Sequence, residues 1–148
     1  MMKCLVMYNQ NQVKQQEYKS MKVIYNSIIP FPGYAFINIC GILFGRKECK
    51  KKINEKVINH ESIHSEQMKE LGYIFFYIFY LFEWIIKIPL SWFYKQPANT
   101  YITKIAYRSI SFEQEAYYNE NNYTYLKNRK RYNWIKRIFT MYNYKLKK

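Results

Sequence analysis

The chain of 148 residues has the length of one domain with its own hydrophobic core. Aromatic residues make up 20% of it, which excludes an intrinsically disordered chain. The net charge is +14, and it leaves two interpretations open: an anionic partner, either nucleic acid or lipid headgroups, or the codon bias of an AT-rich genome.

Residues 1–20 are rich in Gln, Asn and Lys, and we expect them to form a loose N-terminal extension. Their apolar run is too short for a signal peptide. The three cysteines lack C-x-x-C spacing and predict neither a disulfide framework nor a thiolate metal site. A reducing compartment, the cytoplasm, is therefore the expected location.

A β-hairpin is expected next. Residues 22–29 are rich in β-branched side chains, residues 35–44 have the composition of a second strand, and the segment 30–33 between them favours a turn. Gly41 within the second strand indicates a bulge or a close backbone approach.

Three helices are expected after the hairpin. The first covers residues 54–72, where apolar side chains recur on one face. The second covers residues 73–88, and Pro89 ends or bends it. The third runs over residues 101–126, after a loop at residues 95–100. Hairpin and helices together predict a mainly helical α+β fold.

The second of these helices is almost continuously apolar. Its uncharged run from Leu71 to Phe82 is 12 residues long, whereas a helix that crosses a bilayer needs about 20 apolar residues. We therefore expect a core helix, or one that is peripheral to or half-embedded in the inner membrane, rather than a membrane span.

Residues 128–148 predict a basic amphipathic tail. From Lys127 onwards the chain has nine basic residues and no acid. Four apolar side chains recur there at helical spacing: Trp134, Ile135, Ile138 and Phe139. Such a helix suits an anionic membrane surface, whereas a nucleic acid would leave the apolar stripe without a role. Packing of the stripe against the domain is the alternative.

Residues 60–64 read HESIH and predict a metal site. On a helix His60 and His64 lie one turn apart on the same face, so both imidazoles can reach a single ion. Zinc accepts imidazole nitrogens, and a catalytic zinc keeps one position open for water. Glu61 is placed to accept the proton of that water. Two surface histidines on an amphipathic helix are the alternative.

A third protein ligand has to be a glutamate, because the chain has no third His, no Asp and no well-placed Cys. The downstream glutamates are Glu66, Glu70, Glu83, Glu113, Glu115 and Glu120. Glu66 and Glu70 follow on the same helix and point wrongly or lie too far along it. Glu113 and Glu115 lie on another helix that can pack against the first, and they stay open as ligands; an exposed acidic face is their alternative.

The motif HESIH followed by E-x-E-A resembles the gluzincin metallopeptidases, in which a second helix supplies a Glu ligand to zinc. In the related membrane-bound prenyl-protein proteases that helix carries a pattern like E-x-x-A-D. Alignment on Ala116 implies Glu113 as the ligand, with Glu115 as the fallback. Two positions depart from the pattern. The Asp that orients a ligand histidine is Tyr117 here, and Glu66 stands where an apolar residue is usual.

The chain is also similar to a group of short, uncharacterised bacterial and phage proteins. They share an IPF-x-G-y hairpin, an NHE-x-IH helix and an AYR-x-ISFE-x-EAY segment, and the similarity covers about residues 21–127. It implies a minimal zincin-like metal-binding domain over this range and names no substrate.

Glu83 needs a partner, because an unpaired buried carboxylate is costly. A structural pair with Arg108 is our first expectation, and Lys87 or the metal site are the other candidates. Arg108 is also a candidate donor to the oxyanion of the reaction, and Tyr107 and Tyr117 are weaker candidates for the same role.

These features predict a zinc-dependent metallopeptidase that hydrolyses amide bonds of a peptide or protein substrate. The edge of the hairpin could hold an extended peptide by strand addition. The alternative belongs to another class: a non-catalytic, basic membrane- or nucleic-acid-binding protein in which the HExxH segment is incidental or structural.

Overall fold

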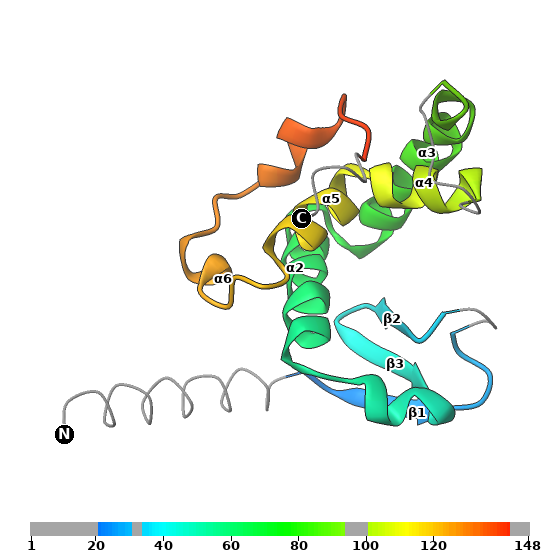
Figure 1. The fold of residues 1–148 in the computed structure, drawn as a ribbon. Coiled ribbons are helices and arrows are strands. Elements are labelled where there is room, and N and C mark those ends of the chain that lie inside the picture. The colour runs from blue at the N-terminus through cyan, green and yellow to red at the C-terminus, as the bar shows by residue number, and fades with distance from the viewer. Residues whose placement is uncertain (1–20, 31–33, 94–100, 143–148) are drawn as a thin grey trace.

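The computed structural model describes residues 21–30, 34–93 and 101–142. It confirms the predicted mainly helical α+β fold (Figure 1). The predicted extension at residues 1–20 and the predicted loop at residues 95–100 lie outside the described residues.

A small sheet contains three short strands: β1 (Val23–Asn26), β2 (Phe36–Ile39) and β3 (Ile42–Arg46). The strand order is β1-β3-β2, so β3 is central. β2 and β3 are antiparallel and form a hairpin near the N-terminal end of the described chain. The predicted hairpin between residues 22–29 and 35–44 is wrong, because β1 pairs with β3 in parallel.

Both strands of the observed hairpin lie within residues 36–46, whereas we expected a single strand over residues 35–44. Cys40 and Gly41 both have positive φ, of 51° and 81°. Two consecutive residues of this kind form the tight turn that suits the twist of a hairpin. Gly41 therefore lies in a turn and not in a bulge, and it splits the expected strand in two.

The chain continues through η1 (Lys47–Lys52) into α2 (Glu55–Leu71) and α3 (Tyr73–Ser91). Asn54 caps the start of α2 by accepting a hydrogen bond from the Val57 amide at 3.0 Å. Gly72, with φ of 75°, ends α2 and leads directly into α3. Pro89 lies inside the last turn of α3, which continues to Ser91 instead of ending there.

The expected helix over residues 101–126 is divided into three pieces: α4 (Ile102–Ser109), α5 (Ser111–Asn119) and α6 (Tyr125–Asn128). The chain is extended at Ile110, with ψ of 133°. Glu83 of α3 stabilises this break, because its carboxylate accepts hydrogen bonds from the Ser111 amide at 2.9 Å and the Ser111 hydroxyl at 2.6 Å. A side chain from α3 thus caps the N-terminus of α5.

The predicted pairing of Glu83 with Arg108 is consequently wrong for the described residues. Glu83 lies 3.6 Å from the ammonium group of Lys87, one of the other candidates. The Arg108 guanidinium stacks on the rings of Tyr117 and Tyr142, at 5.2 and 5.5 Å from their centroids. The carboxylate is used to hold a helix terminus, which sequence spacing could not indicate.

The four apolar residues of the tail do not share one helical face, contrary to the predicted amphipathic helix. The described part of this segment forms only the short η2 (Asn133–Arg137). Trp134 is buried in the core, whereas Ile135 is 49% and Phe139 97% exposed. The expected contact of residues 128–148 with an anionic membrane surface stays a prediction.

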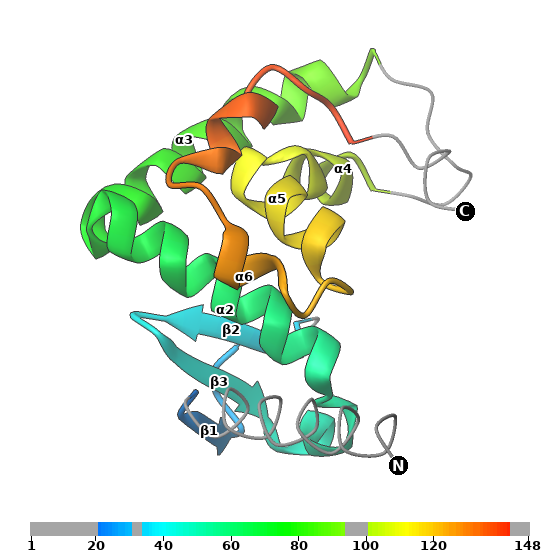
Figure 2. The ribbon, with the colours of Figure 1, turned by 90° about the vertical axis from the view of Figure 1, so that its left-hand side faces the viewer.

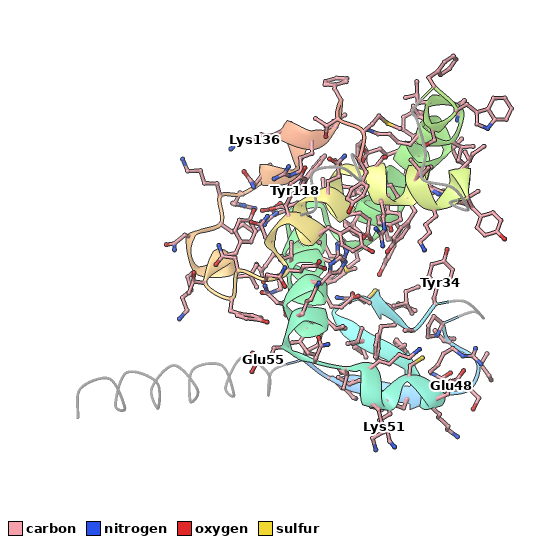
Figure 3. All side chains as sticks on the ribbon, viewed as in Figure 1. Tyr34, Glu48, Lys51, Glu55, Tyr118 and Lys136 are labelled. Atoms are coloured by element: carbon pink, nitrogen blue, oxygen red, sulfur yellow. The ribbon has the colours of Figure 1, made fainter. Side chains whose placement is uncertain are left out.

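α2 lies between the sheet and the remaining helices (Figures 1 and 2). On the sheet side, the Asn38 amide of β2 donates hydrogen bonds to the Glu61 carbonyl and the Ser65 hydroxyl, at 2.8 and 2.9 Å. On the other side is the main core cluster, formed by Met68, Phe76, Ile110, Phe112 and Trp134. Figure 3 shows Tyr34 rising from the sheet towards α4, where its ring lies 6.4 Å from that of Tyr107.

Candidate metal centre

Three buried side chains from two helices meet between α2 and α5. α2 places His60 and His64 one turn apart, with their Nε2 atoms separated by 3.2 Å. α5 packs against α2 and brings Glu113 to both: Oε2 lies 3.4 Å from His60 Nε2, and Oε1 lies 3.2 Å from His64 Nε2. These three residues could hold a metal ion. The expected closeness of Glu113 to both histidines is thus present.

The spacing of these atoms fits a metal ion. Ligand atoms bound tetrahedrally to zinc at 2.0–2.1 Å lie about 3.3 Å from one another. In addition, Oε2 of Glu113 is buried and has no hydrogen-bond partner among the described residues. A buried carboxylate oxygen without a donor is costly, and a cation at this point would satisfy it.

His60 is oriented by a glutamate that we did not single out. Its Nδ1 lies 3.3 Å from Oε2 of Glu120, which is buried and also bound by Lys56 at 3.1 Å. A carboxylate accepts hydrogen bonds, so Nδ1 carries a proton, and it is Nε2 that would give up its proton and turn a lone pair towards the centre when a metal ion binds. Glu120 is therefore placed to fix the orientation of the His60 ring. Glu120 follows Glu113 by seven residues, which is about two turns of a helix. This spacing could have indicated that both carboxylates face the histidines.

His64 is oriented by Gln67 in the same way. The amide NH₂ of Gln67 donates to the Phe112 carbonyl at 3.2 Å and to Glu115 at 2.9 Å. Its oxygen therefore faces Nδ1 of His64, at 2.8 Å, and accepts the proton there. The i, i+3 spacing from His64 could have indicated Gln67, but nothing in the sequence distinguishes it from an ordinary polar residue of a helix.

Glu115, the fallback ligand, points away from the histidines. Its carboxylate binds Arg129 at 2.7 Å, Tyr125 at 2.6 Å and Gln67. Burial alone would raise the pKa of Glu115, but these donors, with Arg129 first, hold the pKa below its usual value. Arg129 also binds Glu70, so a buried ion pair joins the tail to both ligand helices.

Glu61 is half-buried beside the centre. The described chain donates no hydrogen bond to its carboxylate, although its backbone carbonyl is held by Asn38. Burial raises the pKa of this carboxyl group, and the neighbouring His64 and His60 partly offset the effect. The carboxylate is thus electrostatically coupled to the ligands without being bound to them.

The ligands favour their charged forms. Burial would lower the pKa of His60, but the carboxylates of Glu113 and Glu120 raise it to about 10. Burial likewise would raise the pKa of Glu113, and His64 and His60 hold it far below its usual range instead. A metal ion competes with protons for such a set, so its binding releases protons.

Two aromatic side chains contact the residues of the centre, Tyr80 and Tyr117. The Tyr80 hydroxyl of α3 donates to Oε1 of Glu113 at 2.8 Å. The Tyr117 ring packs on His60 with its centroid 4.7 Å away, and Arg108 stacks on that ring. Arg108 is therefore separated from His60 by a ring, and the oxyanion role proposed for it and for Tyr117 stays a prediction.

Replacement of Glu120 by alanine is expected to weaken metal affinity by about 10–100-fold, because His60 then loses the group that fixes its orientation. The affinity can be measured by titration against a fluorescent zinc chelator. Glu55→Ala is the matched control, since Glu55 is exposed at the start of the same helix and points away from the site (Figure 3). Equal affinities in the two variants would contradict the orienting role.

No protein-family model, curated protein or solved structure matches this chain. The functional argument therefore uses the residues themselves: two histidines on one helix, a glutamate on a second helix, and a further carboxylate beside them. These residues make up a candidate metal centre in a mainly helical α+β domain.

Proposed function

We propose that the protein is a zinc-dependent metallopeptidase of the gluzincin type. The observation that carries this proposal is the buried group of His60, His64 and Glu113, whose ligand atoms all lie within 4.8 Å of one another. Glu61, next to the first histidine, is the candidate base. The resemblance of the HESIH and E-x-E-A motifs to gluzincins supports the same function.

The donor set favours zinc over the other common metal ions. Two imidazoles and one carboxylate suit zinc, whereas calcium and magnesium prefer oxygen ligands alone. Three protein ligands leave a coordination position open, as in catalytic rather than structural zinc sites. When bound, zinc polarises a carbonyl group and lowers the pKa of its water to about 7.

The residues of the chain have separate tasks in amide hydrolysis. Glu61 accepts the proton of the attacking water and delivers it to the leaving amine. Burial raises the pKa of Glu61, which is the direction that suits a group that both takes and returns a proton. Glu120 and Gln67 keep the ligand histidines in the tautomer that presents Nε2. Tyr80 fixes the position of Glu113 through one carboxylate oxygen.

An extended substrate could lie along β2. This strand is at the edge of the sheet, so its outer backbone groups could pair with a peptide. The Tyr77 hydroxyl covers one end of that side, where it binds the Cys40 amide at 2.9 Å and the Asn38 carbonyl at 3.4 Å, so the peptide would pair with the part before Asn38 or displace this hydroxyl. Asn38 of β2 binds the Glu61 carbonyl directly, which places the edge strand beside the catalytic turn of α2. A peptide that pairs with β2 would therefore pass the metal centre.

The proposal is tested by metal analysis together with a cleavage assay. Protein purified without chelator is expected to contain about one zinc ion per chain. A mixture of synthetic peptides, analysed by mass spectrometry, should then show new termini that disappear when a chelator is added and return with zinc. His60→Ala should lose both the metal and the cleavage. A zinc-loaded protein that cleaves none of the peptides would contradict peptidase activity, and a protein that binds no zinc would contradict the metal site.

A further inference from the structure

We propose that one face of α3 lies flat in a single leaflet of a lipid bilayer, with the helix axis parallel to the membrane. This inference is independent of the proposed hydrolysis. Among the described residues α3 is the only helix whose length and composition would allow it to cross a membrane, and 17% of its apolar window is buried. Its outer face, formed by Ile74, Phe75, Ile78, Phe79, Phe82 and Ile85, is 48–74% exposed.

The outer face is apolar because both charged residues of α3 point into the domain. Glu83 binds Ser111, as described above. Lys87 is 3% exposed and donates to the carbonyls of Ile138 and Thr140, at 2.6 and 2.7 Å. A continuous apolar surface of this kind is unusual on a soluble monomer, and it indicates a binding surface. The occupant has to be apolar as well.

The contacts of the inner face determine the orientation of the helix. Near its start, Phe76 packs on Phe112 of α5, with ring centroids 4.8 Å apart. In its second half, Trp84 and Lys87 contact the backbone of α4 and of the segment after η2. Other elements of the domain therefore lie beside α3 from its start to its second half (Figure 2). In a spanning orientation these polar elements would enter the hydrocarbon, whereas in the parallel orientation they stay in water.

The charges and ring positions favour lipid over a second copy of the chain. Tyr73 and Trp92, at the two ends of α3, are 41% and 72% exposed, and these residue types prefer the membrane interface. Between Glu83 and Glu113 the chain, which includes α4, has four basic residues and no acid. Lys87 points into the domain, which leaves Lys95, Lys104 and Arg108. Anionic headgroups attract such a surface. In a symmetric dimer through α3, the same positive charges would face one another and repel.

Flotation with vesicles tests the contact. The full chain is expected to float with neutral phosphatidylcholine vesicles, and more strongly with vesicles that contain anionic lipid. Ile78→Glu should lower the partition coefficient by at least about tenfold, because the burial of one Ile side chain is worth more than one factor of ten. Ile28→Glu is the matched control: Ile28 is 78% exposed but lies near the sheet, and its replacement should change nothing. Circular dichroism shows whether both variants keep the fold.

Two further measurements separate the parallel orientation from its rivals. With tryptophan placed by Phe82→Trp in the middle of the outer face, lipids brominated near the headgroup should quench its fluorescence better than lipids brominated near the chain end. The opposite order would mean a membrane span and would overturn the proposal. A chain that does not float, or Ile78→Glu floating like the unchanged protein, would also overturn it. So would a dimer in light scattering that Ile78→Glu dissociates in the absence of lipid, since the occupant would then be a second copy.

Discussion

Replacement of Glu61 by glutamine is expected to lower peptide hydrolysis by about 10²–10⁴-fold and to leave the metal in place. Glutamine has the same shape as glutamate but cannot take a proton from water. Glu61 is outside the group of ligand atoms formed by His60, His64 and Glu113, so its loss should not empty the site. The measurements are kcat/KM for a cleaved peptide and the zinc content of the purified variant.

Glu66→Gln is the control for this variant. It removes the same charge from the same helix, but the Glu66 side chain is 43% exposed and binds Lys69 at the surface. Its activity and metal content should equal those of the unchanged protein. Loss of zinc in Glu61→Gln would mean that Glu61 is itself a ligand, and equal activities in the two variants would mean that another group is the base.

Arg129→Met is expected to lower the free energy of unfolding by about 3–5 kcal/mol, the usual cost of removing one partner of a buried ion pair. The side chains of Arg129, Glu70 and Glu115 are 5%, 6% and 0% exposed. Without the guanidinium, two carboxylates stay buried and unpaired. Denaturant unfolding followed by circular dichroism measures the change. Arg131→Met, two residues further on and exposed, should cost less than about 1 kcal/mol.

The effect of Arg129→Met should depend on pH. In the unchanged protein the pKa of Glu115 is held below its usual value near 4.5, so this carboxylate stabilises the fold above pH 4.5 and loses that effect as the pH falls through the folded pKa. In the variant, the largest contribution that lowers this pKa is lost while burial still raises it, so the folded pKa moves upward and protonation at low pH relieves part of the cost. The difference in unfolding free energy between the two proteins should therefore be largest near neutral pH and shrink below about pH 4.5. A difference that is constant with pH would contradict the pairing.

The local part of the metal site could be predicted from sequence, and the part made by packing could not. Helical spacing alone brings His60 and His64 to one face, because the pitch of a helix is fixed. The third ligand required elimination of other residue types and a resemblance, which together led to Glu113. Gln67 and Glu120 were missed, since their partners depend on how α5 lies against α2.

The errors in the fold have the same origin. The expected helix over residues 101–126 has adequate helical pattern throughout, and only a tertiary contact from Glu83 shows why the chain is extended at Ile110. In the tail, apolar spacing is the same for a membrane surface and for a core. In the structure Trp134 is buried and Phe139 is exposed. The spacing of apolar residues does not predict which of the two is buried.

The buried pair of Arg129 with Glu115 also bears on how the metal centre matures during synthesis. His64 leaves the ribosome first, and Arg129 follows 65 residues later (129 − 64), which at about 5–20 residues per second takes roughly 3–13 s. During this interval a nascent chain exposes two histidines before it can supply Glu113, and it exposes Gln67 before Arg129 can hold Glu115 beside it. We therefore expect metal capture to be a late, post-translational event that reports on correct docking of the tail.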